Sequence, residues 1–268
     1  MKCAAVVVAS LLALAAAAHA DQAPTDVLRV CADPDNLPYS SADGTGFENR
    51  IARLLAQDLG VDLQYAWLPD RRGFVRKTMG SGECDVLLGV PVGDARTQPT
   101  QPYYRSSYVW VQRADAGAPP ASFDDPRLRR WRIGVQLIGN DLAASPPGFA
   151  LARHVPGAQV IGFPVPGDTP AAQRMVEAVA RGELDGAVVW GPQAGYFAQR
   201  AAVPLKVARL APPADLPRGQ TFEFAIAVGV RKGDDGLRER LEQAVHRRQA
   251  DIDRILAQYA VPRAEEVR

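Results

Sequence analysis

Asp85-Val86-Leu87-Leu88-Gly89-Val90 is the stretch of sequence that decides the fold. It is a continuous apolar run, which is typical of a strand buried on both faces of a parallel sheet. Residues 28–32 give a second strand pattern, and apolar residues recur at helical spacing from Phe47 to Leu59. Strands that alternate with helices in this way predict an α/β fold built on parallel sheets.

The alternation continues along the chain and is interrupted twice. Residues 114–126 and 211–219 are rich in Pro, Gly, Ala and Asp, which marks them as joints between folded units. We therefore expect two lobes with a central cleft between them. Further strands are expected at residues 63–67, 108–111, 132–136, 159–163, 185–190, 205–210 and 222–230, and further helices at 74–79, 170–181, 193–201 and 237–259.

The first twenty residues have the pattern of a targeting segment. Met1-Lys2 supplies a positive start, residues 3–18 are uncharged and apolar, and Ala18-His19-Ala20 offers small residues to a signal peptidase. A stretch this short predicts a cleaved signal peptide of residues 1–20 and export from the cytoplasm. No later stretch approaches the roughly 18 apolar residues that a spanning helix needs, so the chain is not expected to span a membrane.

Composition excludes some classes of partner. The chain has 31 Lys and Arg against 30 Asp and Glu, and removal of residues 1–20 takes away one lysine and no acid. The exported chain is therefore formally neutral, which argues against a nucleic-acid-binding protein. Hydrophobic residues make up 47% of the sequence, which is enough for a sizeable core.

Cys31 and Cys84 are the two cysteines that follow the signal peptide. In an oxidising compartment an even pair favours a disulfide. However, Cys31 lies late in one predicted strand and Cys84 just before another, and parallel neighbours in the usual register would hold the two sulfurs too far apart. The alternative is two buried, unbonded thiols, and both interpretations stay open at this point.

Catalytic motifs are sparse after the signal peptide. His154 and His246 are the only histidines there, and neither has the neighbours of a metal site. No G-x-S-x-G elbow, P-loop or G-x-G-x-x-G occurs. We therefore expect no catalytic residue, no metal site and no bound cofactor, and hence a binding protein rather than an enzyme.

The candidate binding residues lie in loops that follow or precede predicted strands, where ligands of open α/β sheets are bound. Their rings, guanidinium and carboxylates suit a small polar or amphipathic ligand, or a projecting loop of a partner. Ordinary loop packing is the competing interpretation for each one taken singly. The candidates are Asp33, Asn36, Pro38, Tyr39, Arg96, Tyr103, Tyr104 and Trp190.

Several of these segments resemble the type II periplasmic solute-binding proteins of the amino-acid-binding class. The shared motifs are the run from Leu28 through Pro38-Tyr39, Gly46-Phe47-Glu48, residues 82–86, Pro102-Tyr103-Tyr104 and residues 228–234. The resemblance implies lobe 1 from residues 21–112 and 219–268, lobe 2 from residues 113–218, and a periplasmic location. It also adds Glu48 to the candidate residues of the cleft.

The chain departs from amino-acid receptors at one decisive position. The resemblance places Arg96 where that class holds the ligand carboxylate. It places Trp190 where that class holds the ligand ammonium with an acid. Because a buried ammonium without a carboxylate partner is costly, α-amino acids are expected to be poor ligands.

Six motifs in order are similar to the MxaJ/XoxJ family, whose members are binding-protein-like partners of quinoprotein (PQQ) methanol and alcohol dehydrogenases. This resemblance implies a periplasmic accessory role in the activation or maturation of such a dehydrogenase. The alternative is a receptor that delivers a small organic solute to an ABC importer. The motifs are residues 30–40, 46–49, 72–76, 84–91, 105–109 and 189–197.

Overall fold

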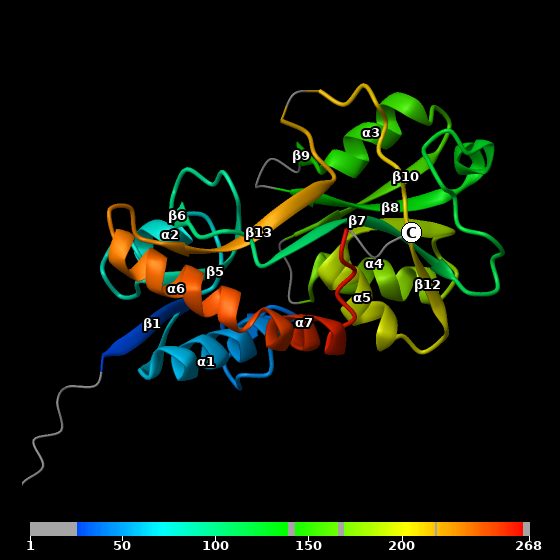
Figure 1. Ribbon diagram of the computed structural model, residues 1–268. Coiled ribbons are helices and arrows are strands. Elements are labelled where there is room, and N and C mark those ends of the chain that lie inside the picture. Colours follow the sequence, from blue (N-terminus) through cyan, green and yellow to red (C-terminus); the bar gives the residue numbers. More distant parts are fainter. Residues whose placement is uncertain (1–25, 139–142, 166–168, 218, 265–268) are drawn as a thin grey trace, which may run out of the picture.

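The computed structural model describes residues 26–138, 143–165, 169–217 and 219–264 (Figure 1). The predicted signal peptide, residues 1–20, lies outside the described residues.

One sheet of eleven strands runs through the molecule, in the order β10-β8-β11-β7-β13-β5-β1-β4 with three short or branching strands attached. The strands are β1 (Val27–Ala32), β4 (Asp62–Trp67), β5 (Val86–Pro91), β6 (Gln98–Pro99), β7 (Tyr104–Arg113), β8 (Arg132–Ile138), β9 (Ala143–Ala144), β10 (Gln159–Pro164), β11 (Gly186–Trp190), β12 (Leu205–Arg209) and β13 (Glu223–Val230). A separate two-stranded ribbon joins β2 (Asp35–Asn36) and β3 (Ser40–Ser41).

Seven helices pack against this sheet in the described part of the chain. They are α1 (Phe47–Leu59), α2 (Phe74–Lys77), α3 (Pro146–His154), α4 (Ala171–Ala180), α5 (Gly191–Gln199), α6 (Asp235–Arg247) and α7 (Gln249–Gln258). The α/β fold class predicted from the sequence is confirmed. The expectation of purely parallel sheets is wrong, because β7, β12 and β13 all run antiparallel to their neighbours.

Two of these antiparallel strands, β7 and β13, connect the two ends of the sheet. Parallel pairing is confined to β1 with β4 and β5, and to β8 with β10 and β11. These are the βα units, whose crossover helices favour parallel neighbours. Strands β7 and β13 instead carry the chain between those two groups, so their direction is set by the crossing and not by a helix.

Strand β7 belongs to both ends of the sheet. Its first residues, from Tyr104 to Ser107, pair with β13, whereas Val109 and the residues after it pair with β11 and β12. We call β1, β4, β5, β6 and β13 with α1, α2 and α6 the first half, and β8 to β12 with α3 to α5 the second half. The chain enters and leaves the second half at adjacent points, because Tyr108 N donates to Phe222 O at 2.8 Å. The predicted lobe bounds at residues 112/113 and 218/219 stay a prediction.

Helix α1 forms because its apolar residues recur on one face. Phe47, Ile51 and Leu55 are fully buried against β1 and β5, and the helix ends where Gly60 adopts the left-handed conformation at φ 69°. Gly60 donates its backbone N–H to carbonyls in the last turn, which satisfies part of the helix terminus. The prediction of this helix from Phe47 to Leu59 is confirmed.

The core of the second half is built around Trp110. Its ring is fully buried, lies 5.6 Å from the ring of Trp131, and donates from Nε1 to Gln112 at 2.8 Å. Gly186 on the neighbouring strand leaves space for that ring, since a Cβ there would lie 2.0 Å from Trp110. Helix α3 was not predicted, because Pro146-Pro147-Gly148 has the composition of a loop, although proline is favoured in a first helical turn.

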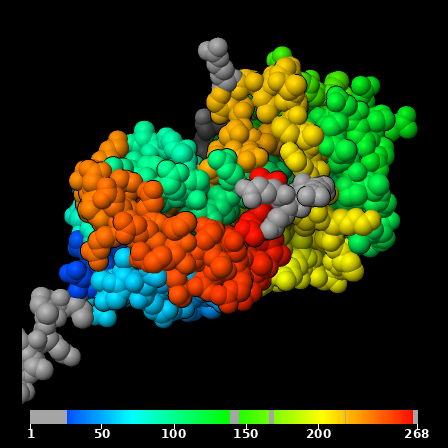
Figure 2. Space-filling model, in the orientation of Figure 1, coloured from blue at the N-terminus to red at the C-terminus, as the bar shows by residue number. Residues whose placement is uncertain are grey.

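The C-terminal helical region crosses from one half to the other. A single helix was predicted at residues 237–259, but the structure has α6 and α7, which meet at Arg248. In Figure 2 this orange-to-red stretch runs across the face of the first half and reaches the second. Tyr259 stacks on Tyr196 of α5 at 5.9 Å, and Ser106 Oγ donates to Pro262 O at 2.6 Å. The end of the chain therefore fastens the two halves together.

Candidate functional site

A cavity of about 200 Å³ lies at the carboxyl ends of β1 and β5, where open α/β sheets bind their ligands. Trp190, at the end of β11, brings a side chain of the second half to the same space. The cavity therefore lies where the two halves meet. Its lining residues are Cys31, Ala32, Asp33, Asn36, Tyr39, Ser40, Glu48, Asp70, Phe74, Leu87, Leu88, Gly89, Tyr104, Trp190 and Ile226.

Most of the residues predicted for the cleft lie around this cavity. They come from the β1–α1 loop, the first turn of α1, the start of β7 and the end of β11, four segments far apart in the sequence. The structure brings together Asp33, Asn36, Tyr39, Glu48, Tyr104 and Trp190.

Three predicted residues do not line the cavity. Pro38 is buried, and its carbonyl accepts a hydrogen bond from Phe47 N at 2.8 Å. Tyr103 is also buried, and its hydroxyl accepts from Gly89 N at 3.3 Å. Arg96 points outward with 66% of its side chain exposed and pairs with Asp94, Nη2 to Oδ2 at 2.5 Å. Pro38 and Tyr103 therefore pack behind residues that line the cavity. Arg96 pairs with a carboxylate of its own loop and not with a group in the cavity.

Sequence reasoning missed Asp70 and Phe74, which also line the cavity. Asp70 follows β4, and its backbone N–H donates to Asp33 Oδ2 at 2.6 Å, which brings the two loops together. The signal was present, because residues 68–70 follow a predicted strand just as the chosen loops do. Asp70 stands directly before the charge run at 71–77, whose pattern is typical of a solvated helix start.

Glu48 is the most unusual group in the cavity. It stands in the first turn of α1, where its backbone N–H donates to Tyr39 O at 2.9 Å, but its carboxyl group has no hydrogen bond or ion pair with the described residues. Gly89 faces it at φ 74°, and a Cβ on Gly89 would lie 2.3 Å from Glu48 Oε1. Burial, with a smaller contribution from the charge of Asp70, raises the pKa of Glu48 to about 8. The carboxyl group therefore holds its proton at neutral pH.

The rest of the cavity is also short of positive charge. Burial raises the pKa of Asp70, the charge of Asp33 adds to that effect, and Arg96 opposes it. Burial is likewise the main reason why the pKa values of Tyr39 and Tyr104 lie well above their usual range. Three acids and several rings thus share a space into which no described cationic side chain projects.

A larger groove of about 710 Å³ shares the β1–α1 loop with this cavity. Helices α4 and α5 form most of it, and Asp35 and Leu37 of the β1–α1 loop close one side. Its walls include Val176, Tyr196 and Phe197, so it is largely apolar. None of the predicted cleft residues lines it.

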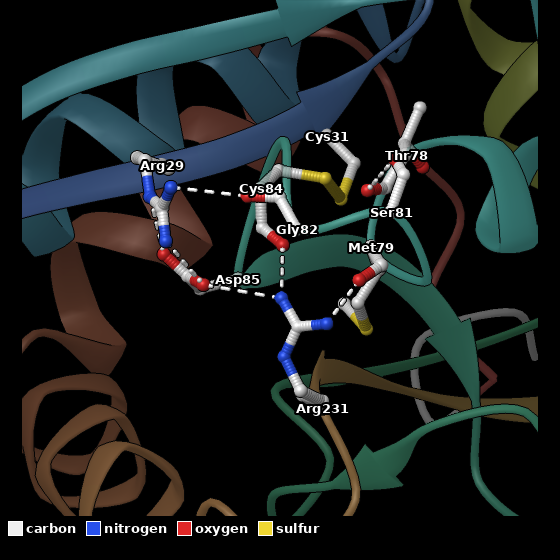
Figure 3. A network of polar contacts seen from close by, with 9 residues as sticks. All are labelled: Arg29, Cys31, Thr78, Met79, Ser81, Gly82, Cys84, Asp85 and Arg231. Atoms are coloured by element: carbon white, nitrogen blue, oxygen red, sulfur yellow. Dashed lines mark hydrogen bonds and ion pairs between the residues drawn. A yellow bond between two sulfur atoms is a disulfide. The ribbon is translucent and has the colours of Figure 1, made fainter.

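A disulfide joins Cys31 and Cys84, whose Cα atoms are 5.3 Å apart. The strand register expected from the sequence would hold the two sulfurs too far apart. This expectation does not apply, because the chain bends at Asp85 before β5 begins and Cys84 lies outside the strand. Figure 3 shows how this bend is held. Arg29 makes a two-pronged contact with Asp85 at 2.8 and 2.9 Å, and Arg231 donates to Cys84 O at 3.0 Å.

Among the described residues, no group of His, Cys, Asp or Glu has the arrangement of a metal site. None of the described helices combines the length and the apolar character that a membrane span requires.

Residues 28–262 match the family model of the bacterial extracellular solute-binding proteins, family 3. The chain belongs to this family. Within it, the chain is 31% identical to Protein MoxJ of Paracoccus denitrificans over 95% of this chain and 94% of that protein. The crystal structure of MxaJ from Methlophaga aminisulfidivorans MPT has 27% identity and a TM-score of 0.75, with 88% of this chain and 99% of that chain covered.

A third relative is the periplasmic binding protein XoxJ from Methylobacterium extorquens AM1, with 34% identity, a TM-score of 0.71, and 88% and 98% of the two chains covered. The chain is thus a family 3 solute-binding protein of the MxaJ/XoxJ type, which confirms the predicted resemblance. Membership of this extracellular family agrees with the periplasmic location expected from the sequence.

The Glu48 carboxyl gives this family 3 protein a specific pH dependence. In the folded protein the pKa of Glu48 is about 8, against an ordinary value of 4.5. The stabilisation that protonated Glu48 provides is therefore fully present below pH 4.5 and is lost as the pH rises through 8. We expect Glu48→Gln, which keeps the neutral shape, to match the wild type at pH 5 and to exceed its free energy of unfolding at pH 9. The gain is on the order of 1.4 kcal/mol per unit of pKa shift.

Urea unfolding of both proteins at pH 5, 7 and 9 measures this difference. Asp115→Asn, at an exposed carboxylate paired with Arg113, is the matched control and should give a profile parallel to the wild type. Parallel profiles for Glu48→Gln and the wild type would show that the Glu48 proton is not held as described.

Proposed function

We propose that this chain is a non-catalytic periplasmic accessory protein of a quinoprotein (PQQ-dependent) methanol or alcohol dehydrogenase, and that it aids the activation or maturation of that enzyme. The observation that carries the proposal is the similarity to MoxJ, MxaJ and XoxJ along almost the whole chain. The proposed partner holds the PQQ, and this chain supplies a binding surface.

The position of the histidines supports a non-catalytic role. His154, at the end of α3, contacts Asp215 at 3.0 Å, and His246 is exposed on α6. Neither lines the cavity at the carboxyl ends of β1 and β5. The groups that do line it are acids, phenols, an amide, a hydroxyl, an indole and apolar side chains, which serve to recognise a ligand. No nucleophile paired with a general base is among them.

The proposal is tested by producing the dehydrogenase with and without this chain and measuring the specific activity of the purified enzyme. We expect higher activity when the two are made together, and recovery of the dehydrogenase on the tagged chain from periplasmic extract. Equal activity in both preparations and no recovered dehydrogenase would refute the proposal.

Replacing Arg96 and Trp190 by alanine is expected to weaken dehydrogenase binding about tenfold or more, since aromatic and arginine side chains usually anchor protein contacts. Arg96 is exposed and Trp190 is partly exposed at the cavity, so both are accessible to a partner. Surface plasmon resonance with immobilised dehydrogenase measures the effect, and circular dichroism checks the fold. Arg113→Ala, which removes an equally local pair with Asp115, is the matched control and should bind like the wild type.

A second candidate function is a receptor that delivers a small solute to an ABC importer, and the cavity of about 200 Å³ favours it. Deletion of the gene separates the two functions. Loss of dehydrogenase activity supports the accessory role. Intact dehydrogenase activity with loss of uptake of one solute supports the importer.

A further inference from the structure

We propose that the cavity at the carboxyl ends of β1 and β5 binds a small organic cation that carries an alkylammonium group and no carboxylate. This inference goes beyond the proposed function and does not depend on it, because it concerns the isolated chain and a free small molecule.

The charged side chains around the cavity favour a cationic ligand. Three acids line the cavity, and Arg96, whose charge acts on Asp70, is already held by both oxygens of Asp94. Both oxygens of Asp33 are occupied as well, since they accept from the backbone N–H groups of Asp35 and Asp70 at 2.8 and 2.6 Å. Glu48 and Asp70 are thus the carboxyl groups that remain for a ligand.

The aromatic rings around the cavity favour an ammonium group independently of the acids. Tyr39, Tyr104 and Trp190 line the same small space. Trp190 is held edge-on between Tyr108 and Phe224, with ring centroids 5.5 and 5.4 Å apart. Aromatic faces attract ammonium groups, and a site that combines several rings with a carboxylate is the usual means of recognising them.

The pocket is also built around Glu48. The glycine at position 89 leaves room for the carboxyl group, because any side chain there would contact Oε1. Burial raises the pKa of Glu48 and so disfavours the charged form of its carboxyl group. A bound cation restores a partner for the charged form, so binding releases a proton and becomes tighter as the pH rises towards 9.

The charges of the cavity also bear on amino acids. The expectation that their ammonium would lack a carboxylate partner does not apply, because Asp33, Glu48 and Asp70 line the cavity. An α-carboxylate would instead be repelled by these acids, and the guanidinium of Arg96 points outward, so α-amino acids are disfavoured by their negative charge.

Isothermal titration of the purified mature chain at pH 8.5 tests the inference, with choline and methylammonium as probes. The neutral isostere of choline, 3,3-dimethylbutan-1-ol, and the amino acid glycine serve as comparisons. We expect at least one ammonium probe to bind, and the isostere and glycine to bind at least tenfold more weakly. Equal binding of choline and its isostere, binding of glycine as tight as that of the ammonium probes, or no binding of either ammonium probe would overturn the inference.

Glu48→Gln is expected to weaken binding of the ammonium probe at least tenfold, whereas Asp115→Asn should leave it unchanged. Should Glu48→Gln fail to fold, Asp70→Asn at the cavity wall replaces it with the same expectation. Unchanged binding in the folded cavity variant would overturn the inference. The dehydrogenase is absent from this experiment, so its failure and that of the proposed function are observed separately.

Discussion

Replacing Cys31 and Cys84 together by alanine is expected to lower the free energy of unfolding by about 4 kcal/mol. The two cysteines are 53 residues apart, and closing a loop of that length restricts the unfolded chain by roughly this amount. Alanine is chosen because both positions are buried beside Phe74 and Met79, where a serine hydroxyl would lack a partner. Guanidinium unfolding of the variant and the wild type measures the loss.

The reducing agent provides the matched control for this experiment. Wild-type protein unfolded and refolded in dithiothreitol should fall to the stability of the double variant, and the variant itself should not respond. Because Cys31 and Ala32 line the cavity, the loss is also expected to weaken ligand binding there. A wild type whose unfolding midpoint is the same with and without reductant would contradict the prediction.

The Gly195→Ala variant is expected to lose about 3 kcal/mol of unfolding free energy, a large cost for one methyl group. Gly195 lies in α5 against the C-terminal segment, and a Cβ there would lie 1.7 Å from Ala260 O and 2.7 Å from its carbonyl carbon. Backbone atoms cannot relieve a clash by changing rotamer as a side chain can. The segment after α7 must therefore move away from the second half. Thermal unfolding followed by circular dichroism measures the loss.

Gly236→Ala is the matched control, with the opposite expected sign. Gly236 lies in α6, and a Cβ there would meet no atom within 4 Å. Alanine restricts the unfolded chain more than glycine does, so we expect a gain of roughly 0.5–1 kcal/mol. A loss in both variants, or in neither, would show that contact with Ala260 is not what distinguishes the two sites.

Local pattern was enough to predict most of the elements. Apolar spacing predicted α1 from Phe47 to Leu59, and the run from Asp85 to Val90 predicted β5, because each segment buries one continuous set of side chains. Strand direction could not be predicted in the same way. Whether β7 and β13 run parallel or antiparallel depends on how the chain crosses between halves, and alternation within a strand carries no information about that.

The candidate site could likewise be predicted only in part from the sequence. Residues in strand-end loops, such as Asp33, Tyr39 and Trp190, were predicted because the carboxyl ends of the strands meet at one edge. Arg96 was placed by resemblance, and its pairing with Asp94 depends on the turn at Gly93, which a motif does not reveal. Of the three acids of the cavity, Asp33 and Glu48 were predicted and Asp70 was missed, because Asp70 lies on a separate loop after β4 that meets the other two only in the folded chain.

The hydrogen bond between Tyr108 and Phe222 has a consequence for how such proteins diversify. Everything between those two residues is one uninterrupted stretch of coding sequence whose ends emerge side by side. Recombination between related genes at these two points exchanges a whole second half without altering the connections that receive it. The exchanged half must then match its contacts with the rest of the chain, among them Trp190 with Phe224 and Gly195 with Ala260 and Pro262 at the end of the chain. A chimera that also carries the donor's last residues is therefore the one expected to fold.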